Sequence, residues 1–149
     1  MRGQRKQANL MLKILLAEWS RAEITARHVR QAVFINEQNV PEEDEWGHGD
    51  EEALHLIASL DGNPIATARL AADGTIGRMA VLKSFRNQGT GSAMMEQLIK
   101  TAKQNRFRVL KLNAQRTAEG FYAKHGFIAQ GEEFMDAGIL HIEMTLEIV

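Results

Sequence analysis

The sequence predicts an α/β (α+β) fold in which helices flank a mixed, mostly antiparallel sheet. Three short apolar segments between residues 54 and 82 are separated by the turn sequences DGNP at 61–64 and DG at 73–74, a pattern typical of consecutive antiparallel strands. Helical patterns interrupt the strand patterns irregularly, so the expected element order is β-α-β-β-β-α-β-α-β-β. A doubly wound parallel sheet would require regular alternation of strands and helices, and we do not expect one.

The first expected elements are a strand and a long helix. Apolar residues dominate 10–19, and a helical pattern extends over 20–38. Ser20 followed by Glu23 has the form of a capping box, in which the two side chains bond free amides of the first turn. For the acidic segment 39–52 we expect a long loop or a short irregular helix.

The second half of the chain predicts two more helices and three more strands. Met95, Leu98 and Ala102 share one helical face, so residues 90–104 should form an amphipathic helix. A second, short helix should end at Gly126, a residue type favoured at left-handed C-caps. The remaining elements are expected as a strand at 107–114, the short helix at 117–126 and strands at 127–134 and 138–149.

Length and composition fit one domain of ordinary size. The 149 residues are 44% hydrophobic, so we expect a single domain at 10–149 preceded by a flexible basic tail at 1–9. The net charge of −1 gives no reason to expect a nucleic-acid partner, and no apolar run reaches the ~20 residues that cross a membrane. The absence of cysteine excludes disulfides and thiolate chemistry. A cytoplasmic protein, with a homodimer left open, is compatible with these features.

Charges are segregated along the chain. Residues 31–68 contain nine acidic residues and no lysine or arginine, whereas residues 78–124 contain ten basic residues and two acids. Such blocks are most often solvated faces. The alternative is a basic half that binds an anionic cofactor and an acidic half that binds a cationic substrate.

A glycine-bearing loop at 86–91 lies between an apolar strand and the helix expected at 90–104. Gly89 and Gly91 allow the backbone to approach a ligand, the helix start directs free amides to one point, and Arg86 adds a positive charge. This arrangement suits a pyrophosphate, although a tight turn without a ligand is the alternative. The P-loop and dinucleotide fingerprints do not fit, since the latter would need a glycine at Met94.

The sequence RNQGTG at 86–91 matches the Arg/Gln-x-x-Gly-x-Gly/Ala signature of the GNAT acetyltransferase superfamily. The surrounding sequence also resembles this family, in particular its ElaA-like and glyphosate-acetylating small-molecule branch. The segments that carry the resemblance are 33–41, 76–103, 110–127 and 138–144. The resemblance covers nearly everything after residue 10 and implies a GNAT fold, in which a V-shaped cofactor cleft divides the sheet.

The resemblance implies acetyl-CoA as cosubstrate. Its pyrophosphate would bind the amides of 88–92, and its pantetheine arm would bind the backbone of 79–81. The arm would enter between the strands that carry Met79 and Asn113. The implied cofactor-binding residues are Met79, Ala80, Val81, Arg86, Asn87, Gln88, Gly89, Thr90, Gly91, Ser92, Asn113 and Tyr122.

Acetyl transfer to an amine requires a proton for the departing thiolate. A phenol with a pKa of about 10 can remain protonated and donate to a thiolate whose acid has a pKa near ~8.5. Tyr122 is the only tyrosine in the chain, and its position in GFYAKHGF matches the GNAT tyrosine beside the CoA sulfur. We therefore assign Tyr122 as general acid, with simple ring packing as the alternative.

The general base is less determined by the sequence. His141 lies in the expected last strand, where the glyphosate-acetylating relatives carry a catalytic histidine. Histidine as a residue type, with a reference pKa near ~6.5, suits proton removal at neutral pH. A purely structural histidine is equally compatible with this position. Glu37, Glu45 or a relayed water are the other candidates. His48, Asp50 and His55 do not have the spacing of a zinc site, so we expect no metal.

The acceptor is expected to be a small molecule with a primary amine. Glu37, Glu45 and Arg78 are the candidate substrate-binding residues. Glyphosate-type relatives hold an anionic substrate with arginines, but Gln115 and Gly77 occupy two of the matching positions here. Arg78 is displaced by one residue, which on a regular strand would turn it to the opposite face. Together with the acidic segment, this favours an uncharged or cationic amine.

Two other functions remain open at this point. A non-catalytic acyl-CoA-binding or sensing module would keep the glycine loop and lose the chemistry, although Tyr122 and His141 count against it. An acetyltransferase of protein N-termini or lysines would need a peptide groove, which the sequence cannot reveal.

Overall fold

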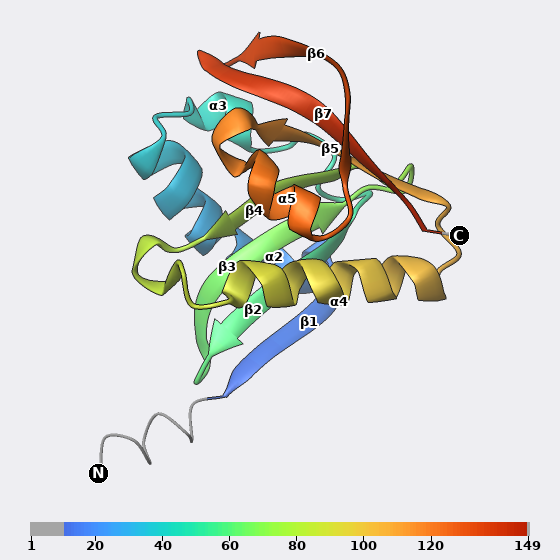
Figure 1. The fold of residues 1–149 in the computed structure, drawn as a ribbon. Coiled ribbons are helices and arrows are strands. Elements are labelled where there is room, and N and C mark those ends of the chain that lie inside the picture. Colours follow the sequence, from blue (N-terminus) through green and yellow to red (C-terminus); the bar gives the residue numbers. More distant parts are fainter. Residues whose placement is uncertain (1–10, 149) are drawn as a thin grey trace, which may run out of the picture.

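Two antiparallel sheets organise the part of the chain that the computed structural model describes, residues 11–148 (Figure 1). The tail expected at 1–9 lies outside these residues. The first sheet has the order β1-β2-β3-β4, with β1 (Leu12–Glu18), β2 (Leu54–Leu60), β3 (Asn63–Leu70) and β4 (Ile76–Val81). The second has the order β5-β7-β6, with β5 (Val109–Gln115), β7 (Ile139–Glu147) and β6 (Ile128–Asp136). The expected mixed fold with mostly antiparallel pairing is confirmed.

Helices cover both faces of the first sheet. The four consecutive residues 65–68 of β3 are all buried, which requires packing on both sides of the strand. On one side lies α4, whose Met94, Met95 and Leu98 are buried in the main core. The helical elements are α2 (Trp19–Arg30), η1 (Gln31–Glu37), α3 (Glu42–Glu45), η2 (Lys83–Phe85), α4 (Thr90–Gln104), η3 (Arg116–Ala118) and α5 (Glu119–Lys124).

The two sheets meet at one point and diverge from it. Thr75 and Lys111 form an isolated parallel bridge, after which β4 and β5 separate. Gly74 makes this junction possible: its φ is +91°, and a Cβ there would lie 2.3 Å from the Val109 carbonyl oxygen. The divergence produces the V-shaped opening that the sequence predicts between the strands of Met79 and Asn113.

The start of the long helix differs from the expectation. β1 continues directly into α2, so Glu18 is the N-cap residue and no side chain caps the helix. The predicted capping box is therefore wrong: Ser20 lies inside the first turn, and Glu23 accepts a hydrogen bond from Arg27 Nε at 2.8 Å. The helix expected over 20–38 also changes into the π-helical η1 at Gln31.

A bulge interrupts the pairing of β3 and β4. Thr67 pairs with Ala80 and Arg69 with Gly77, so two residue steps on β3 match three on β4. Arg78 lies in the bulge with φ +47°. The regular alternation that would turn Arg78 away from the expected site therefore does not apply to this strand.

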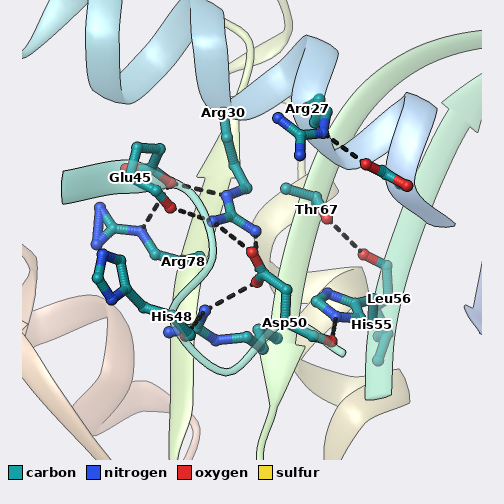
Figure 2. A network of polar contacts seen from close by, with 11 residues as sticks. Arg27, Arg30, Glu45, His48, Asp50, His55, Leu56, Thr67 and Arg78 are labelled. Carbon is teal, nitrogen blue, oxygen red and sulfur yellow. Dashed lines mark hydrogen bonds and ion pairs between the residues drawn. The ribbon is translucent and has the colours of Figure 1, made fainter. Parts of the chain in front are cut away.

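A buried ion-pair network anchors the acidic segment to α2 and β3 (Figure 2). Arg30 donates from Nε to Glu45 at 2.7 Å and from Nη1 to Asp50 at 2.8 Å. Asp50 also accepts from Arg69 Nη1 at 2.9 Å, and its carbonyl oxygen accepts from His55 Nε2 at 2.8 Å. Buried charges require such pairing, so these acids hold the loop in place.

Candidate active site

A cleft of about 790 Å³ lies in the opening between β4 and β5. Of the residues predicted for the site, those that line the cleft are Arg78, Met79, Ala80, Val81, Arg86, Asn87, Gly91, Asn113, Tyr122 and His141. They come from β4, the loop before α4, β5, α5 and β7. Residues that are distant in sequence are thus brought together around one cavity.

The start of α4 has the backbone geometry that the expected anion cradle requires. Asn87 and Gly89 have left-handed φ angles of +62° and +87°, and the first helical hydrogen bond runs from Ala93 N to the Gly89 carbonyl at 3.0 Å. The amides of 90–92 precede this bond, and no side chain caps this end of α4, whose residues are all described. Free amides at the positive end of a helix dipole suit a phosphate group.

The edge of β4 offers a second set of backbone groups. β4 pairs with β3 on one side, whereas beyond the Thr75–Lys111 bridge its other edge faces the cleft. Such an edge can bond an extended amide-containing arm as an added strand would. The cradle and this edge lie along the same cleft. The residues present therefore fit both the pyrophosphate and the pantetheine arm of a CoA cosubstrate.

The other loop side chains have partners within the protein. Gln88 Nε2 donates to the Ser84 carbonyl at 3.3 Å, and Ser92 Oγ lies 3.2 Å from His125 Nε2. Thr90 is buried. The cleft lining does not include Gln88, Gly89, Thr90 or Ser92. At the cradle these residues therefore offer their backbone amides and not their side chains.

Arg86 is not a free positive charge. Its guanidinium forms a bidentate ion pair with Glu37, with both N–O distances at 2.7 Å, while Nε donates to the Val81 carbonyl at 2.9 Å. The hydrogen bonds and charge of Arg86 lower the pKa of Glu37 below its usual value. This arrangement fixes the loop against η1, and it makes Glu37 a weaker proton acceptor than an ordinary glutamate.

Tyr122 is half-buried on α5 and lines the cleft. Its ring packs edge-on against Phe121 and Phe127, with centroid distances of 5.1 and 6.1 Å. Burial raises the pKa of the Tyr122 phenol above its usual value. The group therefore stays protonated at neutral pH, as a proton donor must.

His141 lines the same cleft from β7 and is buried, with 9% of its surface exposed. Its Nδ1 lies 2.7 Å from the Ile139 carbonyl oxygen, and its ring stacks on Phe134. A carbonyl only accepts, so Nδ1 carries the proton and the neutral ring has its lone pair on Nε2. This tautomer is the one that a proton acceptor at Nε2 requires.

Glu45 and Arg78 differ in their access to the cleft. Glu45 is 2% exposed and does not line the cavity, because it pairs with Arg30 and lies behind Arg78. Arg78 does line the cavity, and its guanidinium lies 3.8 Å from the centroid of the Phe34 ring. Of these two predicted substrate contacts, only Arg78 is therefore open to the cavity.

Four aromatic or charged residues of the lining were not expected at the site from the sequence. Phe34, Arg69, Phe121 and Asp136 contribute to the cleft from four separate elements. Phe121 has a local signal, since it precedes Tyr122 on a short helix. Asp136 begins a hairpin turn, where an aspartate is ordinarily explained by turn geometry. The local patterns around Phe34 and Arg69 are explained equally well if these residues only pack in a helix and a strand. The sequence therefore carries no signal that they line the cleft.

Residues 11–148 contain neither a candidate metal-binding group nor a membrane-spanning helix. No group of three or more histidine and acidic side chains in this range is arranged to hold a metal ion. No helix in the same range is long and apolar enough to span a bilayer.

Comparisons with known proteins identify the family of the chain. A family model described as an acetyltransferase (GNAT) domain matches residues 14–148. The uncharacterized N-acetyltransferase YjcF of Bacillus subtilis is 36% identical over 137 residues, covering 89% of this chain and 98% of YjcF.

Two solved structures show the same fold. The crystal structure of Escherichia coli ElaA superposes with a TM-score of 0.80 at 27% identity, covering 92% of this chain and 100% of ElaA. An acyl-CoA N-acyltransferase from Pseudomonas aeruginosa superposes with a TM-score of 0.78 at 27% identity, covering 91% and 99%. The resemblance inferred from the sequence is confirmed: the chain belongs to the GNAT acetyltransferases, which are acyltransferases that use an acyl-CoA cosubstrate.

Proposed function

We propose that this protein is an acetyl-CoA-dependent N-acetyltransferase that transfers acetyl directly to a primary amine of a small molecule. One observation carries the proposal: Tyr122 and His141 line the same cleft as the cradle loop and the free edge of β4. A proton donor, a proton acceptor and the cosubstrate-binding backbone therefore converge on one cavity. Direct transfer is favoured because the chain has no cysteine to carry an acyl group.

The side chains have complementary roles in this proposal. Bound acetyl-CoA supplies an activated thioester carbonyl. The amine nitrogen bonds to the acetyl carbon while His141 Nε2 accepts a proton from that nitrogen. The carbon–sulfur bond of the thioester then breaks. Tyr122 Oη donates its proton to the departing sulfur, so that the protons and charges balance. The lowered pKa of Glu37 and the burial of Glu45 favour His141 over these carboxylates as base.

The test is acetyl-CoA consumption over a panel of small primary amines, peptides with free N-termini and lysine peptides. We expect turnover with small amines. Turnover restricted to peptides would instead indicate a protein acetyltransferase. Binding of acetyl-CoA without turnover of any amine would indicate a sensing module.

The role of His141 is tested by His141→Gln. Loss of the imidazole base should reduce kcat about 10²- to 10⁴-fold near pH 7, with partial recovery at high pH, where more of the free amine is already deprotonated. His28→Gln is the matched control, because His28 is exposed on α2. An unchanged rate in His141→Gln would transfer the base role to a carboxylate or water.

A further inference from the structure

Two of the three arginines that line the cleft are neutralised by carboxylates. Arg69 donates from Nη1 to Asp50 at 2.9 Å. Arg86 forms the bidentate pair with Glu37. Both guanidiniums therefore have a protein partner for their charge.

Arg78 is the third cleft arginine, and it is held differently. Its Nε lies 3.3 Å from Glu45 Oε2, and its guanidinium stacks on Phe34, so the inner side of the group is fixed. Figure 2 shows Arg78 beside Glu45. Within residues 11–148, neither of its terminal nitrogens has a hydrogen-bond partner. Glu45 in turn shares its charge with Arg30 at 2.7 Å. Arg78 thus lines the cavity with two open donors.

The backbone at Arg78 is strained in a way that supports a functional role. A φ of +47° is unfavourable for an arginine, and it arises from the bulge between β3 and β4. Strained positions of this kind persist where the surrounding structure enforces them and are concentrated at functional sites. The bulge lies directly before Met79, within the part of β4 that lines the cleft.

Partial burial makes an open guanidinium costly. The Arg78 side chain is 32% exposed, and burial lowers its pKa from the usual value. Glu45 shares one charge between Arg30 and Arg78, so it does not fully compensate both. A carboxylate that accepts two parallel hydrogen bonds from the terminal nitrogens would satisfy this group.

We propose that Arg78 binds a carboxylate of the acceptor, so that the acceptor is an amine that also carries an acidic group, as an amino acid does. This inference rests on the proposed function, because it names the substrate class of that same site. The amine would lie near His141, which lines the same cavity as Arg78.

The distribution of acids argues against the cationic acceptor expected from the sequence. None of the nine acids in 31–68 lines the cleft. The three that contact arginines of the cleft lining, Glu37, Glu45 and Asp50, are each paired with arginine. Asp136 is the only acidic residue of the lining within 11–148, and it lies close enough to Arg78 to favour the charged guanidinium. The acidic segment therefore offers no free negative field to this cavity.

The experiment compares kcat/KM for three matched acceptors: an amino acid, its amide and the corresponding decarboxylated amine. We expect the wild-type protein to prefer the amino acid. Arg78→Gln should lower kcat/KM for the amino acid about 10- to 100-fold and leave the two other amines within about threefold, as expected for a charge-assisted hydrogen bond. Arg78→Lys should retain part of the preference for the amino acid, because lysine keeps the positive charge but cannot donate two parallel hydrogen bonds to a carboxylate.

Arg116→Gln is the matched control, since Arg116 is exposed on η3, pairs with Glu133 and does not line the cleft. It should behave as the wild type. An aminophosphonate in the panel tells whether Arg78 prefers a carboxylate or another oxyanion. A wild-type preference for the amide or the decarboxylated amine would overturn the proposal, as would an unchanged preference in folded Arg78→Gln.

Failure of the proposed function can be distinguished from failure of this inference. If no amine is acetylated, the proposed function fails, and the acceptors are titrated calorimetrically into protein saturated with CoA. Weaker binding of the amino acid in Arg78→Gln alone would still support the subsite. Equal binding in wild type, Arg78→Gln and Arg116→Gln would reject it.

Discussion

Burial determines what Tyr122 can do at the scale of a single residue. The apolar packing of its ring against Phe121 and Phe127 holds the hydroxyl at the cleft and keeps the phenol protonated. A phenol on an exposed helix would also be protonated at neutral pH, but it would have a lower pKa and would not be held at the cleft. For His141 the decisive contact is the Ile139 carbonyl, which selects the tautomer with a free Nε2.

The Tyr122→Phe variant should lose turnover and keep cosubstrate affinity. The ring still packs, but the proton donor is absent, so we expect kcat to fall by about 10²- to 10⁴-fold with little change in acetyl-CoA affinity. In the wild type, kcat should not decline through loss of this acid until the pH exceeds about 10, because burial raises the pKa of the phenol. Steady-state rates and calorimetry measure both effects. Full activity in Tyr122→Phe would mean that another group protonates the thiolate.

Among the elements, the start of α4 and the short α3 contribute most to the site. α4 provides the free amides of the cradle, and α3 provides Glu45 to the ion-pair network behind Arg78. Both depend on local backbone features. The cradle needs a left-handed residue at Gly89, and α3 is held by the ion pair that Glu45 forms with Arg30 of α2.

Gly89→Val should sharply weaken acetyl-CoA binding. A Cβ at Gly89 would meet no protein atom within 4 Å, so a branched side chain there would occupy space next to the cradle amides. The positive φ also costs a few kcal/mol for a β-branched residue. Gly62→Val is the matched control, because Gly62 has a similar φ of +83°, an equally open Cβ position and a place in the distant β2–β3 turn. Equal affinities of the two folded variants in calorimetry would contradict the cradle assignment.

Glu45→Ala should destabilise the fold strongly. It leaves Arg30 buried with Asp50 as its remaining carboxylate partner, and removal of one member of a buried ion pair typically costs about 3–5 kcal/mol. Glu43 lies on the same helix and is exposed, so Glu43→Ala is the matched control. The free energy of unfolding of this variant should stay within about 0.5 kcal/mol of the wild type. Urea unfolding measures both variants. Similar stabilities would show that the network contributes little.

For the whole molecule, the important feature is that two sheets diverge from one bridge. The cleft proposed for the cosubstrate lies between β4 of the first sheet and β5 of the second. A ligand in this cleft would contact both sheets, so its binding energy should stabilise the described structure as a unit.

Acetyl-CoA should therefore shift one cooperative unfolding transition. At a concentration 100 times its Kd, a ligand that binds only the folded state adds about 2.7 kcal/mol to the free energy of unfolding. We expect a single thermal transition that moves upward, with slower amide exchange in both β4 and β5. Such behaviour would also support a single domain at 10–149. Two separate transitions, or protection confined to one sheet, would contradict the proposed position of the ligand.

The sequence by itself determined the elements and the candidate chemistry. The periodicity of 90–104 predicted α4 with its observed bounds, because an amphipathic helix leaves a local pattern that needs no tertiary information. For the same reason, the sequence predicted Gly126 at the end of α5 and the strands β2, β3 and β4, which the turns at 61–64 and 73–74 join. The motif at 86–91, with Tyr122 and His141, identified residues that the fold then brings to one cleft.

Only the tertiary structure decided which charges face the cleft. Glu37 and Glu45 are paired with arginines from distant segments, and a count of acids along the chain cannot reveal such pairs. Arg78 reaches the cavity because a bulge breaks the two-residue alternation of β4, and this bulge depends on pairing with β3. The capping box at Ser20 failed because β1 continues directly into α2. Long-range pairing and burial fix these features, and neither leaves a pattern in the local sequence.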